Sequence, residues 1–169
     1  MRFTPRLARA ALGLAISLLA SAAFAQSFPA GSGNLNTRGT FRVGGCDRAP
    51  FTANGMYTLD AAGVLTEVGA TPILSTLAPQ GSSGRVFSAS FDAVNLLIID
   101  DILEQTADLL CGTAFTLTSS QITESFKLNK RGTRAKIQQR ATFSGTTVFG
   151  SHNGFFKSID RGRWVAAPP

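Results

Sequence analysis

From Gly112 to the end of the chain, apolar and polar residues alternate in short runs that turn residues separate. Alternation with a period of two puts every second side chain on one face of a strand, so each run predicts a strand with one buried face. Turn signals at 129–132, 151–154 and 160–162 divide these runs at short spacing. The pattern predicts a mainly β (α+β) fold, an antiparallel meander that forms a curved sheet or a small barrel.

The first half of the chain contributes further strand patterns. Residues 39–45 and 86–91 alternate, and 56–68 has the pattern of a hairpin around a turn with the sequence DAAG. Residues 71–84 are bounded by prolines and end in glycine and serine, which predicts a connection without regular structure.

One segment has a helical period instead. Between residues 93 and 111, apolar side chains recur on one side at 100° per residue. Asp92 is suited to cap the N-terminus, and Gly112 stands where a C-cap glycine is expected. We therefore predict one amphipathic helix near 93–111. Its acidic residues, among them Asp100, Glu104 and Asp108, are expected to form a solvated face rather than a metal site.

The first 25 residues have the pattern of a secretory signal peptide. Three arginines precede a ten-residue apolar run, and the small residues Ala23 and Ala25 follow it at cleavage-site spacing. The apolar run is shorter than the roughly 20 residues of a membrane-spanning helix, and no later run predicts a transmembrane segment. We expect cleavage after Ala25 and export to the periplasm or the exterior of the cell. The composition is rich in alanine, glycine and arginine and has only four lysines, which suggests a bacterial source.

The remaining chain has the length of one domain with its own hydrophobic core. Residues 26–38 are polar and rich in glycine, which predicts a flexible leader, and 39–169 is predicted to be a single β-rich domain. Cys46 and Cys111 are both in the exported part, where an oxidising compartment favours a disulfide between them. The chain has no C-x-x-C sequence, which argues against a thiol redox enzyme.

Basic residues concentrate in the predicted hairpin around 129–132. Alternation puts its bases on the face opposite the apolar residues, with two more at the turn. The anion-binding candidates are Lys127, Lys130, Arg131, Arg134, Lys136 and Arg140. They fit either the solvated side of a half-buried sheet or a surface for an anionic envelope polymer or lipid headgroup. The absence of aromatic residues from this face argues against nucleic acid.

Aromatic residues supply a second candidate site. The candidates to line the interior are Phe87, Phe91, Phe126, Phe143, Phe149 and Trp164. Beneath a curved sheet such residues form either a packed core or a cavity for an apolar small molecule. The leading hypothesis is an exported, non-enzymatic binding protein whose ligand is apolar and internal or anionic and external. An envelope structural or protein-interaction module is the alternative.

Enzyme signals are sparse. His152 is the only histidine and falls in a predicted turn, and no serine motif accompanies it. A small hydrolase would depend on His152 or on a carboxylate pair drawn from Asp47, Asp60, Glu67 and Asp160. No metal-ligand spacing or cofactor motif is found, so neither a metal nor a cofactor is expected. The sequence indicates no oligomeric state.

Overall fold

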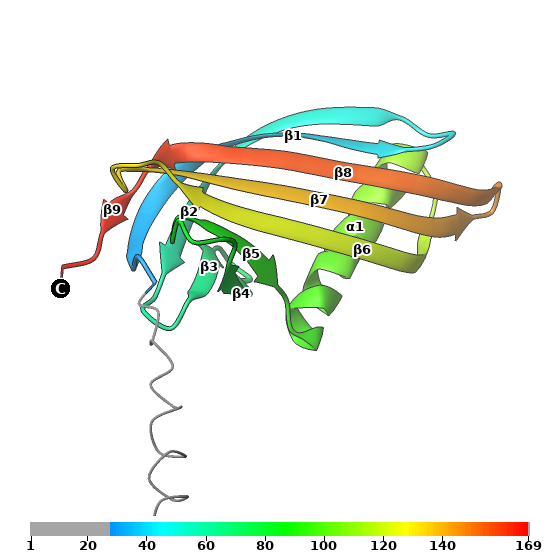
Figure 1. Cartoon of the computed structure of the whole chain (residues 1–169). Helices are drawn as coiled ribbons and strands as arrows, with labels where there is room; N and C mark the ends of the chain where they lie inside the picture. Colours follow the sequence, from blue (N-terminus) through cyan, green and yellow to red (C-terminus); the bar gives the residue numbers. More distant parts are fainter. Residues whose placement is uncertain (1–27, 169) are drawn as a thin grey trace, which may run out of the picture.

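A computed structural model describes residues 28–168 and shows a sheet that closes on itself (Figure 1). The strands are β1 (Gly31–Val43), β2 (Arg48–Leu59), β3 (Val64–Val68), β4 (Ile73–Pro79), β5 (Val86–Ser90), β6 (Thr116–Leu128), β7 (Arg134–Thr147), β8 (Gly150–Arg163) and β9 (Val165–Ala166). Neighbours pair antiparallel in the order β2-β3-β4-β5-β6-β7-β8-β1, and the pairing of β1 with β2 closes an eight-stranded barrel. The predicted antiparallel meander and small barrel are confirmed.

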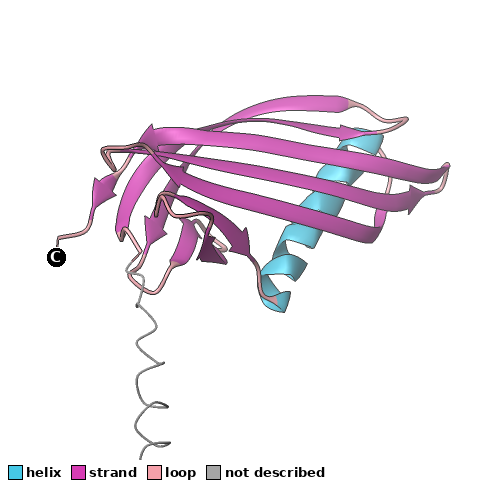
Figure 2. Cartoon of the chain, in the orientation of Figure 1, coloured by secondary structure: helices cyan, strands magenta, loops and turns pink. Residues whose placement is uncertain are grey.

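The barrel wall is incomplete at one end because three of its strands are short. β3, β4 and β5 have five, seven and five residues, whereas β1, β2, β6, β7 and β8 have 12 to 14. β3 pairs only with residues 56–59 of β2, and β5 only with residues 124–127 of β6. The helix α1 (Ala93–Cys111) lies against this end of the barrel (Figure 2).

The helix begins and ends where the sequence predicts. The Asp92 carboxylate accepts a hydrogen bond of 2.8 Å from the backbone N–H of Asn95, and Gly112 ends the helix in the left-handed conformation with φ 63°. A side chain at Gly112 would be strained at this φ, which is why glycine suits the position. The predicted amphipathic helix near 93–111 is confirmed, although Leu109 on its predicted apolar side is 83% exposed.

The helix acids do not form the solvated face that the sequence predicts. Asp100 accepts a hydrogen bond from the Ser120 hydroxyl, Glu104 Oε2 accepts from the N–H of Leu117 at 2.9 Å, and Asp108 accepts from the N–H of Phe115. Two of these donors lie in the part of β6 that β5 does not reach. The helical spacing of four puts the acids on one face, and that face covers this edge of β6.

Further contacts fasten α1 at both ends. Near its start, Asn95 Oδ1 accepts a 2.8 Å hydrogen bond from the N–H of Leu74 in β4. At its end, Cys111 forms a disulfide with Cys46 in the turn between β1 and β2, as predicted. The N–H of Asp47 also donates to the Leu110 carbonyl at 3.3 Å. The helix is thus tied to both sides of the incomplete barrel end.

Several local predictions are wrong. Residues 31–38, predicted as part of a flexible leader, form the first half of β1, and residues 73–79 within the predicted connection form β4. The segments 151–154 and 160–162, predicted as turns, lie inside β8. In each case long pairing with neighbouring strands overrides local turn chemistry, because the barrel supplies a backbone partner for every one of these segments.

Pro50 lies in the part of β2 that has a strand neighbour on one side only. It lies in β2 opposite Thr40 of β1, in the stretch that β3 does not pair. Proline has no N–H to donate to a neighbouring strand, so within sheets it is found mainly on edge strands. Because β3 pairs only with residues 56–59, residues 48–55 form a free edge of the sheet beside α1, and Pro50 fits this position.

Candidate ligand-binding site

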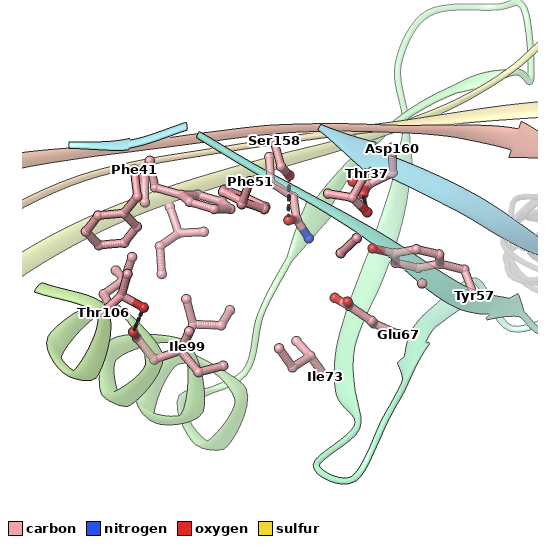
Figure 3. Close-up of a pocket in the computed structure, with 18 of the residues that line it drawn as sticks. Thr37, Phe41, Phe51, Tyr57, Glu67, Ile73, Ile99, Thr106, Ser158 and Asp160 are labelled. Atoms are coloured by element: carbon pink, nitrogen blue, oxygen red, sulfur yellow. Dashed lines mark hydrogen bonds between the residues drawn. The ribbon is translucent and has the colours of Figure 1, made fainter. Parts of the chain in front are cut away.

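A cavity of about 410 Å³ lies between the barrel interior and α1 (Figure 3). Its apolar walls come from β1, β2, β4, β6, β7, β8, the segment before α1 and α1 itself, and include Phe41, Phe51, Ile73, Phe91, Ile99, Ile102, Leu103, Ile122, Ala141 and Phe156. Its polar lining comprises Thr37, Asn54, Tyr57, Glu67, Thr106, Gln139, Ser158 and Asp160. The lining contains no lysine, arginine or histidine among the described residues.

The mouth of the cavity lies at the free edge of β2. Ala53 and Asn54 line the cavity and are exposed, and Ile102 on α1 is 47% exposed. Because β3 does not pair with residues 48–55, no strand closes the space between this edge and the helix. The opening therefore follows from the shortness of β3.

Most of the polar lining belongs to a belt of polar side chains that crosses the barrel interior. Glu124 of β6 is opposite Gln139 of β7, which is opposite Ser158 of β8. The Ser158 hydroxyl donates to Gln139 Oε1 at 3.0 Å, Gln139 Nε2 donates to Glu124 Oε2 at 2.8 Å, and the Ser75 hydroxyl donates to Glu124 Oε1 at 2.7 Å. Each oxygen of the buried Glu124 carboxyl thus accepts a hydrogen bond, one from Ser75 and the other from Gln139.

The belt separates two apolar clusters. One fills the closed end of the barrel and consists of Leu35, Tyr57, Leu59, Leu65, Leu77, Phe87, Phe126, Leu128, Ala135, Ile137 and Trp164. The other lies beneath α1 and consists of Phe41, Val43, Leu103, Ala107, Phe115, Ala141 and Phe143. The cavity lies beside the belt, so a molecule inside it meets most of the polar lining on the side of the belt and mainly apolar side chains around the rest.

Asp160 is the most buried acid of the belt, with no exposed surface. It lies opposite Thr37 of β1, whose hydroxyl donates to Asp160 Oδ1. Asp160 Oδ2 has no hydrogen-bond partner among the described residues, although the side chain lines the cavity. Burial raises the pKa of this carboxyl above its ordinary value, against the opposing effect of the hydrogen bond from Thr37.

Glu67 and Tyr57 complete the belt on β2 and β3. They are directly opposite in register, and Figure 3 shows both near Asp160. Burial raises the pKa of Glu67, and the nearby charges of Asp160 and Glu124 raise it further. Burial also raises the pKa of Glu124 and of the Tyr57 phenol. Three carboxyl groups thus share one poorly solvated region that lacks a basic partner in the cavity lining.

The structure distributes the predicted interior residues among core, cavity and surface. Phe91 lines the cavity, whereas Phe87, Phe126 and Trp164 pack in the closed end and Phe143 packs beneath α1. The expected interior position of Phe149 is wrong: this residue lies in the turn between β7 and β8 and is 81% exposed. The turn falls there because β8 already begins at Gly150.

His152 and the proposed acid pair also have defined positions. His152 lies in β8, not in a turn, where Nδ1 is 2.8 Å from the Gly44 carbonyl and Nε2 is 2.8 Å from the Thr147 hydroxyl. Both ring nitrogens therefore have structural partners. Of the four acids considered for catalysis, Glu67 and Asp160 line one cavity, whereas Asp47 and Asp60 are exposed.

The basic residues line the outer face of the barrel. Lys127 of β6 is opposite Lys136 of β7, which is opposite Arg161 of β8, and directly opposed residues share a face. In the same way Arg134 is opposite Arg163, and Arg140 is opposite Lys157. Lys130 and Arg131 are exposed at the turn between β6 and β7. The outer face thus includes three bases of β8 in addition to the hairpin candidates.

A scan against protein-family models, a search of curated proteins and a search of solved structures each returned no match for the chain. The class of the protein is therefore defined by its own fold, a closed eight-stranded antiparallel β-barrel with one helix beside an internal cavity. Within residues 28–168, no helix combines the length and apolar character needed to cross a membrane.

Proposed function

We propose that the chain is an exported, non-enzymatic binding protein that holds a small, mostly apolar molecule inside the barrel. The observation that carries this proposal is the cavity of about 410 Å³, with largely apolar walls and polar groups that belong mostly to the belt. Ligand sites in proteins have this composition and a volume of about 300 to 1,000 Å³. A purely structural domain of this size would gain more stability from filling the space with side chains.

Export is supported by two independent features. The first 25 residues have the order of charge, apolar run and small residues that a signal peptide requires. Cys46 and Cys111 are paired, which suits an oxidising compartment. We propose a mature chain beginning at Gln26 that acts in the periplasm or outside the cell.

A fluorescence assay with the neutral apolar dye N-phenyl-1-naphthylamine tests the internal site. Ala53 is exposed at the mouth and lines the cavity, so Ala53→Trp should block entry without crowding the core. Its neighbour Thr52 is exposed and faces away, opposite Arg38, so Thr52→Trp is the matched control. We expect saturable one-to-one binding that Ala53→Trp weakens by about tenfold and Thr52→Trp leaves unchanged. Equal dye binding by both variants, or none by the wild type, would exclude the internal site.

The outer basic face supports a second candidate function, binding to an anionic lipid headgroup or envelope polymer. Its specific support is the register, which places Lys127, Lys136 and Arg161 in one row across three strands. A surface hollow lined by Lys127, Arg134, Lys136, Arg161 and Arg163 accompanies this row. Like charges held side by side cost free energy unless solvent or a counter-charge relieves them, so an anionic surface would be favoured there.

Vesicle cosedimentation tests the second candidate. The double variant Arg134→Gln/Lys136→Gln removes two positive charges from the basic face. The matched control Arg42→Gln/Arg48→Gln also removes two positive charges, from residues that are paired in register on β1 and β2. We expect phosphatidylglycerol vesicles, but not phosphatidylcholine vesicles, to retain the protein at low salt. Retention should fall several-fold in the first variant only. Equal retention of both variants would mean that this face is an ordinary solvated surface.

A further inference from the structure

We propose that the molecule held in the cavity is an apolar amine, with its cationic nitrogen directed at Asp160 and its hydrocarbon part against the apolar wall. This inference rests on the proposed internal binding site and specifies its ligand class. The belt of polar side chains includes one buried acceptor atom to which none of the described residues donates a hydrogen bond.

The acceptor is Asp160 Oδ2. The Thr37 hydroxyl occupies the other oxygen of this carboxyl, and the whole side chain is buried at 0% exposure. Oδ2 has no hydrogen-bond partner among the described residues, and Asp160 lines the cavity. A buried oxygen without a donor costs free energy that a ligand N–H or O–H in the cavity would recover. The ligand is therefore expected to carry a hydrogen-bond donor at its polar end.

The charges around the cavity select among possible donors. Glu67 lines the same cavity as Asp160, and Glu124 is hydrogen-bonded to the lining residue Gln139. No basic side chain lines this cavity among the described residues. An ammonium group in the cavity would stabilise the ionised form of these carboxyls and so oppose the effect of burial on their pKa, whereas the carboxylate of a fatty acid or a phosphate would meet no counter-charge among the described lining residues. The arrangement thus favours an ammonium group over a neutral hydroxyl and disfavours an anion.

Aromatic residues add to this preference. Tyr57, Phe51 and Phe156 line the cavity, and the Phe51 and Phe156 rings stack with centroids 5.8 Å apart. Aromatic faces attract cations through their quadrupole, most strongly where water is excluded. The remaining apolar wall, which includes Ile73, Phe91 and the helix residue Ile102, suits a hydrocarbon chain. Cation-attracting and apolar surfaces therefore meet in one cavity.

Isothermal titration with three probes of equal chain length tests the inference: decylamine, decanol and decanoate. The wild type is expected to bind decylamine at least about tenfold more tightly than decanol, and decanoate the least. Asp160→Asn should weaken decylamine binding by about tenfold and leave decanol within about threefold. Asp101→Asn is the matched control, because it makes the same change at an exposed acid of α1 that does not line the cavity, and it should preserve the preference for the amine.

The outcomes separate this inference from the proposed function. If decanol or decanoate binds as tightly as decylamine, the internal site stands and the amine assignment is wrong. If none of the three binds, the internal site itself is wrong. Circular dichroism establishes that each variant is folded. Should Asp160→Asn fail to fold, Glu67→Gln provides the second test, since it removes a carboxylate from the same cavity and must reduce the amine preference if charge determines it.

Discussion

Thr37 and Asp160 are 123 residues apart in sequence, yet the Thr37 hydroxyl donates directly to Asp160 Oδ1 inside the barrel. The pairing of β1 with β8 places them opposite each other, and this is the contact that orients the carboxyl at the polar end of the cavity. It leaves the buried Asp160 Oδ2 without a hydrogen-bond partner among the described residues, in a residue that lines the cavity. Asp160 thus combines a hydrogen bond between β1 and β8 with a candidate ligand contact.

Removing this contact should destabilise the protein. Thr37→Val keeps the side-chain shape but leaves both oxygens of a fully buried carboxyl without a donor from β1, which should lower the free energy of unfolding by about 1–3 kcal/mol. Urea denaturation measures the change. Thr40→Val on the same strand, opposite Pro50 and Lys157, is the control and should change stability by about 0.5 kcal/mol or less. Equal effects would show that the Thr37 bond contributes nothing specific.

The acids of the belt should make stability fall as pH rises. Burial raises the folded-state pKa of Asp160, Glu124 and Glu67 above the ordinary values of 3.8 for aspartate and 4.5 for glutamate. The folded protein therefore keeps these protons to higher pH than the unfolded chain does. Their contribution is fully present below the ordinary pKa and is lost as pH rises through the raised one.

This pH dependence can be measured by urea denaturation between pH 4.5 and 8. The wild type should lose stability across this range, and Glu124→Gln, which cannot ionise, should have a shallower dependence. Asp101→Asn changes an exposed acid on α1 and serves as the control, with the wild-type slope retained. A Glu124→Gln variant whose slope matches the wild type would contradict the raised pKa.

The contact between α1 and the open edge of β6 predicts a difference between two helix acids. Glu104 accepts the Leu117 N–H, whereas Asp101 accepts only the exposed Gln105 side chain. Glu104→Ala should therefore cost about 1–2 kcal/mol of unfolding free energy because it leaves a partly buried N–H unsatisfied. Asp101→Ala should cost about 0.5 kcal/mol or less. Similar values for the two would restore the hypothesis of a solvated acidic face.

The disulfide should be a major source of stability. Cys46 and Cys111 are separated by 65 positions, and a loop of that length corresponds to about 4 kcal/mol in the chain-entropy model. The double variant Cys46→Ala/Cys111→Ala should unfold at correspondingly lower urea concentration than the oxidised wild type, and reducing agent should shift the wild type alone. Identical midpoints for the variant and the oxidised wild type would contradict a stabilising bridge.

Export and processing form a separate prediction. Expressed in a bacterium with residues 1–25 intact, the protein should be recovered from the periplasm or the medium with Gln26 at its N-terminus and two hydrogens fewer than the reduced chain. Intact mass spectrometry after denaturation measures both changes at once. Recovery of the full-length chain from the cytoplasm would remove the support for an exported function.

Local patterns in the sequence predict much of this fold. Alternation around 129–132 gives the β6–β7 hairpin, and Asp92 and Gly112 give both ends of α1. Turn preference fails at 151–154 and 160–162, because long strands can carry glycine and asparagine through a barrel wall when both neighbours pair with them. The free edge of β2 depends on how far β3 extends, and a single sequence gives no measure of that length.

The polar belt is harder to predict, although the sequence contains a signal for it. Glu124 lies between Ile122 and Phe126 on the apolar side of its strand, so alternation alone puts a carboxyl in the interior. Alternation along β8 also puts Asp160 in the interior, but only if the strand continues through this residue. The turn predicted at 160–162 would end the strand there, so the sequence alone does not place Asp160 inside. That these acids meet Glu67 and Tyr57 is a consequence of barrel closure, in which β1 pairs both with β2 and with β8 from the other end of the chain.

Native mass spectrometry of the exported protein, purified without detergent, is the most direct test of an occupied barrel interior. We expect the mature chain to carry a small additional mass that is released on denaturation, or to bind one molecule of decylamine per chain when decylamine is added. A chain that carries no additional mass, and that acquires none from excess decylamine or decanol, would contradict a binding function for this cavity.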